Sequence, residues 1–380
     1  MRKKILMITE RRSDYSKFKP ILKEISKSKK LEYALVVTGS HLLDEYGMTI
    51  NEIKKDGFKI LSKFDMYEKN RIDSGVGMLR SLGNCIIQLS KILEKEKPDI
   101  ILAGFDIGAN LAVAIAGAHM NIVVAHVEGG DVTGTIDEPI RHSITKFSHI
   151  HFTSNKEASE RIIKMGENPK YIFTVGSPVM DNIITTNYIS DEKLSEKFGL
   201  DFSKPFFIIL QHTVTTEINE IDQYIKNILS VVKEKDIQTV IIHGNADAGS
   251  QKISKIIKNS KINQVYSINF EEYINLLKRS AALIGNSSSG IIETPFLRVP
   301  TINIGTRQQG RLRAKNIIDV GYDKKDIKKA IEKVQFDKKF LSKVKNCSSL
   351  YGNGNSAKKI IKILEDMDLS SVPIQKMIAY

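Results

Sequence analysis

The chain is poor in cysteine. Its 380 residues include two cysteines, Cys85 and Cys347, which lie far apart and in no CxxC pattern. A disulfide framework or a zinc site is therefore not expected, and a reducing compartment suits the chain. We predict a cytoplasmic protein.

Long apolar runs are also absent. No stretch approaches the ~18 consecutive apolar residues of a membrane-spanning helix. The apolar run after the N-terminal MRKK stops at Thr9 and Glu10. It is too short for a signal peptide, and no small-residue cleavage site follows, so a buried first strand explains it better. Low-complexity segments and repeats of roughly 20–50 residues are missing too.

The net charge is +13. A surplus of this size is compatible with an anionic partner such as nucleic acid, a membrane surface or phosphate. The lysines are spread through segments of helical length, such as residues 23–30 and 324–333, and form no single basic arm. We interpret most of them as surface lysines, with a smaller contribution from a phosphate-binding cleft. Neither a nucleic-acid nor a membrane partner is expected.

Short apolar runs rich in β-branched residues alternate with amphipathic segments of helical length. This rhythm predicts parallel sheets with helices on both faces, and the nearly continuous apolar runs suit strands buried on both sides. The predicted strands are Ile5–Thr9, Tyr33–Thr38, Ile100–Gly104, Ile122–Val127, His149–Thr153 and Ile172–Val175, then Phe206–Leu210, Thr239–His243, Val265–Ile268, Ala282–Ile284 and Thr301–Ile304. The predicted helices include Lys19–Ser28, Asn84–Glu94, Lys156–Met165 and Glu271–Arg279.

The rhythm pauses around residues 180–205, and a new strand series begins at Phe206. We therefore predict two doubly wound α/β domains, residues 1–180 and 205–355. Facing each other, they form a cleft lined by the carboxyl ends of their strands, where open α/β sheets bind ligands. Several predicted strands end in polar residues and glycine, which supports a site there.

One strand end has the pattern of a phosphate site. In the run GNSSSGIIE, residues 285–293, small residues lie between a strand and an apolar helix, so backbone N–H groups can approach a phosphate. Capping of that helix by Asn286 and the serines explains the run about equally well. Glu293 could bind ribose hydroxyls or lie on the helix surface. Arg307 and Arg311 suit phosphate but are also ordinary loop residues. The run matches neither GxxxxGK[ST] nor GxGxxG.

Four residues are acid and base candidates: Asp106, Glu128, Asp137 and His212. Moving a proton at a weakly acidic sugar carbon needs a base, and a leaving phosphate needs its charge stabilised. Each residue taken alone is explained equally well as a loop residue or a cap. Metal-ligand spacing such as HExxH and a GxSxG elbow are absent from the sequence, so no metal is expected.

The motifs taken together resemble a known family. They are ITERRSDYSKFKPIL, VTGSHLLDEYGMT, HVEGGDVTGTIDEPIRHSITKFSHIHF, VGSP, QHTVTTE, IGNSSSGIIE and GTRQQGR, in this order over nearly the whole chain. They resemble the hydrolysing UDP-N-acetylglucosamine 2-epimerases of the sialic- and legionaminic-acid pathways. The EGGxx[ST]GTIDxxxRH block is highly specific, whereas VGSP alone is weak.

The resemblance implies a GT-B fold, in which two Rossmann-like domains enclose the active site. It implies conversion of UDP-N-acetylglucosamine and water to N-acetylmannosamine and UDP, which feeds nonulosonic (sialic-type) acid biosynthesis. The route is anti elimination of UDP to a 2-acetamidoglucal, followed by syn addition of water with inversion at C2. It uses no cofactor. A homodimer or homotetramer is expected, with the segment 356–380 packing back on the first domain as a helix.

The resemblance also implies roles for single residues. Arg12 and Ser16 match positions near the diphosphate, Ser287, Ser288 and Glu293 match diphosphate and ribose contacts, and Arg307 matches the arginine of the GTRQ loop. Glu128, Asp137 and Arg141 match sugar-side and catalytic positions, His212 matches the histidine beside the leaving phosphate, and Asn245 and Asp247 match further cleft residues. We also expect His41, at the end of the second strand, to contact substrate.

The chain departs from the family pattern at several positions. The family shows Gly-Asp-Arg after the third strand, where this chain has Phe105, Asp106 and Ile107. Ungapped spacing keeps the catalytic aspartate at Asp106 and removes a positive charge at Ile107. The QHPVT motif has Thr213 in place of proline, and a lysine after the DAGS segment is replaced by Gln251.

Three other functions compete with this interpretation. The first is the same chemistry on UDP-N,N'-diacetylbacillosamine or on a GDP-linked sugar. The second is a GT-B glycosyltransferase, which would need a sugar acceptor, and against which the TIDxxxRH block argues. The third is a non-catalytic nucleotide-sugar sensor, supported by Phe105 and Ile107 alone. Release of UDP without any sugar acceptor would distinguish an epimerase from a glycosyltransferase and from a sensor.

Overall fold

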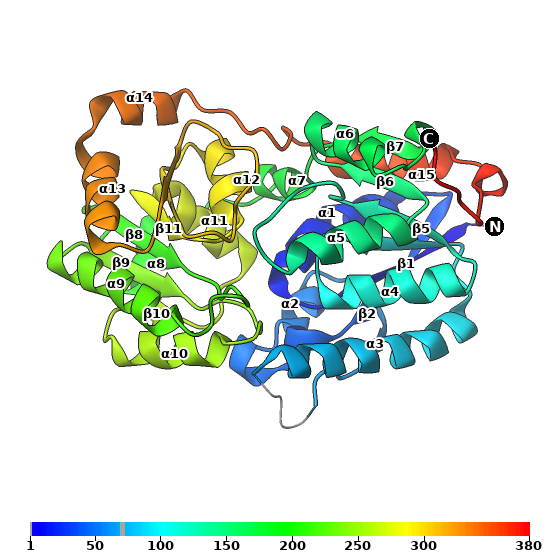
Figure 1. Cartoon of the computed structure of the whole chain (residues 1–380), viewed down its shortest axis with the longest axis horizontal. Helices are drawn as coiled ribbons and strands as arrows, with labels where there is room; N and C mark the ends of the chain where they lie inside the picture. Colours follow the sequence, from blue (N-terminus) through cyan, green and yellow to red (C-terminus); the bar gives the residue numbers. More distant parts are fainter. Residues whose placement is uncertain (1, 69–72) are drawn as a thin grey trace.

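The computed structural model describes residues 2–68 and 73–380 and contains two parallel β-sheets, each covered by helices on both faces (Figure 1). The first sheet has seven strands in the order β3-β2-β1-β4-β5-β6-β7. Its strands are β1 (Lys3–Thr9), β2 (Leu31–Val37), β3 (Ile60–Lys63), β4 (Ile100–Gly104), β5 (Val123–Val127), β6 (Ile150–Thr153) and β7 (Ile172–Thr174). Its helices are α1 (Arg12–Lys27), α2 (Ile50–Lys55), α3 (Gly75–Glu96), α4 (Gly108–His119), α5 (Asp137–Phe147) and α6 (Lys156–Lys164).

The second sheet has six strands in the order β10-β9-β8-β11-β12-β13. They are β8 (Phe206–Leu210), β9 (Gln238–Ile242), β10 (Gln264–Val265), β11 (Ala282–Gly285), β12 (Thr301–Ile304) and β13 (Ile317–Val320). Its helices are α8 (Asp191–Phe198), α9 (Ile221–Glu234), α10 (Ser250–Asn259), α11 (Phe270–Arg279), α12 (Ser289–Leu297), α13 (Lys324–Phe336) and α14 (Lys338–Lys345).

Continuous apolar strands account for two core layers in each domain. All residues of β4, IILAG, are buried, and so are all residues of β5. Alternate side chains of such a strand enter opposite faces of the sheet. Ile100 and Leu102 therefore join the core under α1, whereas Ile101 and Ala103 join the core under α3 and α4.

The predicted parallel α/β fold is confirmed, but two strands were not predicted. β3 and β13 lie at sheet edges, and their residues are half-buried or exposed and never fully buried. Neither strand therefore forms a continuous apolar run. Helix α1 also begins earlier than the predicted Lys19. The Asp14 carboxylate accepts hydrogen bonds from the backbone of Glu10 (2.8 Å) and Arg11 (3.1 Å), and it thereby caps a helix whose first turn is polar.

Two helices, α7 and α15, lie where the chain passes between the two domains. Helix α7 (Val179–Ile184) forms a buried cluster with Ile291, Ile292 and Tyr351 of the second domain. Helix α15 (Ser356–Asp366) then returns to the first domain and packs against α1, as Figure 1 shows. Among the described residues, no helix is long and apolar enough to cross a membrane.

The strand order of each sheet indicates where a ligand-binding crevice is expected. The order reverses between β1 and β4 in the first sheet and between β8 and β11 in the second. Loops diverge at such switch points and leave a crevice at the carboxyl ends of the strands. The predicted site residues after these four strands are Arg12, Asp106, His212 and Ser287.

Candidate active site in the interdomain cleft

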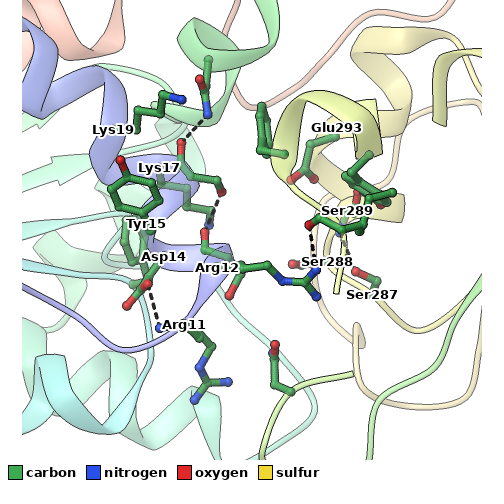
Figure 2. A pocket seen from close by; sticks show the side chains of 18 of the residues that line it. Arg11, Arg12, Asp14, Tyr15, Lys17, Lys19, Ser287, Ser288, Ser289 and Glu293 are labelled. Atoms are coloured by element: carbon green, nitrogen blue, oxygen red, sulfur yellow. Dashed lines mark hydrogen bonds between the residues drawn. The ribbon is translucent and has the colours of Figure 1, made fainter. Parts of the chain in front are cut away.

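A cavity of about 470 Å³ lies between the two switch points. Its first-domain wall includes the start of α1 and the loop after β4. Its second-domain wall includes the loops after β8, β9, β11 and β12. In Figure 2, Arg11, Arg12 and Lys17 lie on one side, and Ser287, Ser288 and Glu293 lie opposite.

The glycine at the end of β11 is required by the close approach of two strands. Gly285 has a φ of +132°, and a Cβ there would lie 2.2 Å from the carbonyl oxygen of Leu210. Beyond it, Asn286 does not cap α12. Its Oδ1 accepts a hydrogen bond from His212 N (2.7 Å), and its Nδ2 donates to His212 O (2.9 Å). The sequence GNSSSG therefore fixes the loop that carries His212 and brings the N-terminus of α12 to the cavity, where its dipole favours an anion.

Glu293 lies inside the cavity wall and not on a helix surface. Its side chain is 8% exposed, its Oε2 has no hydrogen-bond partner, and burial raises its pKa to about 7. A buried carboxylate without partners is unfavourable unless a ligand supplies donors. Two ribose hydroxyls are donors of that kind.

We expect Glu293→Gln to weaken UDP binding by about 1–3 kcal/mol, because a carboxylate accepts hydrogen bonds more strongly than an amide. Calorimetric titration with UDP measures the change. In the wild type the carboxylate is ionised above pH 7 and protonated below it, so UDP affinity should fall as the pH drops through 7. The terminal phosphate of UDP titrates nearby. The diagnostic quantity is therefore the ratio of wild-type to variant affinity, which should shrink from pH 8 to pH 6. A constant ratio would remove Glu293 from the ribose site.

Asp106 lies in a ring of cations. It forms an ion pair with Arg141, whose side chain is 1% exposed, and Arg311 Nη2 lies 3.9 Å from it. Burial opposes ionisation of Asp106, but Arg141, Arg311, Lys17 and Arg307 hold its pKa well below the usual range. Asp106 is therefore a charged carboxylate at neutral pH.

Glu128 follows β5 and contacts Lys17 and Ser177. The Lys17 ammonium also lies 4.6 Å from the centre of the Phe105 ring, a cation–π contact. Phe105 and Glu128 have φ values of +68° and +61°, in the left-handed region that non-glycine residues rarely adopt. Such residues cluster at functional sites. Phe105 and the next residue, Asp106, line the cleft, and the Glu128 carboxylate contacts the cleft residue Lys17.

His212 is a neutral imidazole at physiological pH. Its side chain is 9% exposed, and burial, with the nearby Arg307, lowers its pKa to about 3. Its Nδ1 has no hydrogen-bond partner. A neutral imidazole still donates one N–H. A bound diphosphate would offset the neighbouring guanidinium charges and raise its pKa.

Two reciprocal ion pairs cross the cleft beside His212. Arg307 of the second domain lies 3.3 Å from Asp137 of the first, and Arg11 of the first lies 3.3 Å from Asp247 of the second. Burial and the charge of Asp106 raise the pKa of Asp137. Each domain thus contributes one cation and one anion. These ion pairs favour the arrangement in which the two domains lie close together across the cleft.

Most predicted site residues come together in this cleft. Those that line the cavity are Arg12, Ser16, Asp106, Asp137, His212, Asn245, Ser287, Ser288, Glu293 and Arg307. Glu128, Arg141 and Asp247 lie directly behind it and pair with the lining residues Lys17, Asp106 and Arg11. Sequence reasoning missed Lys17 and Arg11, and it left Arg311 open.

The expectation for His41 has to be corrected. Its imidazole is 0% exposed and lies between the hydroxyls of Thr9 (2.9 Å) and Thr49 (2.6 Å). The short 3₁₀ turn Gly39–Leu42 directs the ring into the first domain. His41 holds the end of β2 in place and does not face the cavity.

Comparison with known proteins assigns the chain to a family. The sequence model described as UDP-N-acetylglucosamine 2-epimerase matches residues 23–365. The chain belongs to this family. A protein of Legionella pneumophila named UDP-N,N'-diacetylbacillosamine 2-epimerase (hydrolyzing) is 32% identical, with 100% of both chains covered. A UDP-N-acetylglucosamine 2-epimerase of Neisseria meningitidis serogroup B is 37% identical, with 87% of both chains covered.

The fold agrees with solved structures of the UDP-N-acetylglucosamine 2-epimerases. The crystal structure of UDP-GlcNAc 2-epimerase from Neisseria meningitidis bound to UDP-GlcNAc superposes with a TM-score of 0.81 at 19% identity, and covers 95% of this chain and 99% of its own. The predicted GT-B arrangement of two Rossmann-like domains is confirmed. The described residues of this family member contain no cluster of three or more His, Cys, Asp or Glu side chains that could hold a metal ion.

Proposed function

We propose that the chain hydrolyses a UDP-linked 2-acetamido sugar and inverts it at C2, releasing UDP. UDP-N-acetylglucosamine is the default substrate and N-acetylmannosamine the product, for nonulosonic acid biosynthesis in the cytoplasm. The observation that carries this proposal is the convergence in one cleft of a helix N-terminus, the ionised Asp106 and the neutral His212. Family membership supports it.

The residues divide the reaction between the two domains. Ser287, Ser288 and Arg307 hold the diphosphate, while Glu293 holds the ribose. His212 donates a hydrogen bond or a proton to the departing phosphate. Electrostatic stabilisation of a leaving group is often the largest catalytic contribution.

Proton transfer falls to the first-domain carboxylates. Asp106 is unprotonated at neutral pH, so its electron pair can accept the C2 proton as the C1–O bond breaks and a C1–C2 double bond forms. Water then adds at C1, and a proton returns to C2 from the opposite face. Glu128 is the second carboxylate for these transfers, and Asp137, whose pKa is raised, is suited to donate a proton.

The residues that depart from the family pattern favour a second candidate sugar as substrate. Phe105 and Ile107 line the cavity where the family has glycine and arginine. Two apolar side chains beside the sugar favour a less hydroxylated sugar, and the Legionella relative is named for UDP-N,N'-diacetylbacillosamine. We therefore propose this sugar, with UDP or GDP as the nucleotide, as the second candidate substrate.

A single incubation tests the reaction class. In D₂O without any acceptor, we expect the pure protein to release UDP and to give a free sugar that carries deuterium at C2, because the abstracted proton exchanges with solvent before water adds. Proton NMR of each candidate substrate identifies the sugar. No release of the nucleoside diphosphate from any candidate would support a sensor. UDP release only with a sugar acceptor would support a glycosyltransferase, and product without C2 deuterium would contradict elimination.

A further inference from the structure

Three polar groups in the wall of the cleft have no role in the reaction described so far. Thr133 Oγ1, Gln308 Oε1 and Arg311 Nη1 have no hydrogen-bond partner among the described residues. All three residues line the cavity and are more than nine-tenths buried. Buried polar groups are normally paired, and an unpaired one is unfavourable. Three such groups in one cavity therefore indicate a ligand that supplies their partners.

A contact between two loops holds these groups together. Arg311 Nε donates a hydrogen bond to the carbonyl oxygen of Val132 (3.0 Å), the residue before Thr133. The backbone N–H of Gly134, the residue after Thr133, donates to the carbonyl oxygen of Arg307 (3.0 Å). The three groups therefore lie where one loop of the first domain meets one loop of the second.

The side-chain amide of Gln308 has a defined orientation. Its Nε2 donates to the carbonyl oxygen of Asn286 (2.8 Å), and a carbonyl oxygen can only accept. Turning the amide over would place two acceptor oxygens against each other. Oε1 is therefore the atom left for a ligand, and the ligand has to provide a donor for it.

Arg311 provides a charged donor beside the catalytic carboxylate. Its Nη2 lies 3.9 Å from Asp106. Burial alone would lower the pKa of Arg311, but nearby acidic groups, with Asp131 and Asp106 among them, raise it, so the guanidinium stays charged. Arg141 cannot take the same role, because its Nη1 and Nη2 already donate to Asp131 and Asp106. Ile107, where the family has arginine, has no side-chain donor.

We propose that Thr133, Gln308 and Arg311 bind the 2-acylamino group of the sugar. Arg311 and the Thr133 hydroxyl donate to its carbonyl oxygen, and Gln308 accepts its N–H. A secondary amide has one strong acceptor and one donor, as these groups require. The position agrees, because Asp106 beside Arg311 is the base assigned to C2, the carbon that carries this group. The proposal rests on the proposed function, and it adds how the chain selects an acylated amino sugar over a plain hexose.

The test measures the ratio of the affinities for UDP-N-acetylglucosamine and UDP-glucose, which differ only in the group at C2. Calorimetric titrations use the full chain with His212→Ala, in which slow turnover leaves both ligands intact. Arg311→Lys keeps the positive charge but loses the fork of donors, so we expect the ratio to fall about tenfold. Gln308→Met removes the acceptor and should lower the ratio about two- to tenfold.

The chain offers a matched control for each variant. Gln309 and Arg313 lie close to the two residues in sequence but are not among the described residues that line the cavity, and Arg313 pairs with the exposed Asp319 (3.0 Å). Gln309→Met and Arg313→Lys should therefore leave the ratio unchanged. A general distortion of the loop would weaken both nucleotide-sugars alike, whereas loss of the acyl contact weakens UDP-N-acetylglucosamine alone.

Two results would overturn the proposal. One is an unchanged ratio in both Arg311→Lys and Gln308→Met. The other is a ratio that falls equally in Gln309→Met and Arg313→Lys, which would mean that the cavity groups have no special part in the selection. The titrations need no turnover. Failure of the wild type to release UDP from nucleotide-sugars would therefore refute the proposed function separately.

Discussion

Replacing Asp106 with asparagine is expected to lower turnover by about 10²–10⁴-fold, the usual effect of losing a general acid or base. Asparagine has the same shape but cannot take the C2 proton. The diphosphate is proposed to bind Ser287, Ser288 and Arg307, which this substitution leaves in place, so UDP affinity should not fall. Steady-state UDP release and calorimetric UDP titration measure the two quantities.

The same substitution has a separate effect on stability. Arg141 is almost fully buried, and removal of its charged partner costs on the order of 3–5 kcal/mol. Thermal unfolding must therefore confirm that the variant is folded at the assay temperature. Asp131→Asn is a matched control, because Asp131 also lies near Arg311 (3.8 Å) but is placed in no catalytic step. Near-normal turnover of a folded Asp106→Asn protein would mean that Phe105 and Ile107 mark a change of chemistry.

Removal of the His212 imidazole should have an effect of similar size, about 10²–10⁴-fold on turnover. Asparagine at this position keeps an N–H donor, so His212→Asn should lose less activity than His212→Ala. Since the pKa of His212 in the free enzyme is about 3, the imidazole is neutral throughout pH 5–8. The pH profile of kcat/KM, which reports the free enzyme, should show no limb from His212 in that range.

Two results would contradict this role. The first is equal activity of His212→Ala and the wild type. The second is a change in the wild-type kcat/KM with a midpoint near pH 6.5 that is absent from the alanine variant. Such a change would mean that His212 has the pKa of an imidazole in water and is not held neutral by its surroundings.

Sequence reasoning succeeded where a single strand determines the outcome. The β4 run IILAG is apolar throughout because both of its faces are covered, and the polar residues after it were correctly expected at the carboxyl edge of the sheet. It failed for β3, whose four residues alternate at an exposed edge and resemble a loop. The placement of the candidate residues after β1, β4, β8 and β11 could be predicted, because parallel strands all end at one edge.

The rest of the site depends on contacts between distant segments. Lys17 is one of 57 lysines and arginines, and its helix α1 looks like any amphipathic helix until β5 brings Glu128 beside it. Arg11 finds Asp247 only when the two domains close. His41 follows a strand as the other candidates do, but the direction of its ring is set by a short turn that the sequence pattern does not reveal.

The return of α15 to the first domain has a consequence for synthesis on the ribosome. The core under α1 includes Ala357, Ile360 and Leu364, and the Lys3 ammonium donates to the α15 carbonyl of Leu364 (2.9 Å). Domains of a growing chain usually fold in the order in which they emerge. Here the first domain stays incomplete until α15 is translated, whereas every strand of the second domain is already available. The nascent chain should therefore complete its second domain before its first.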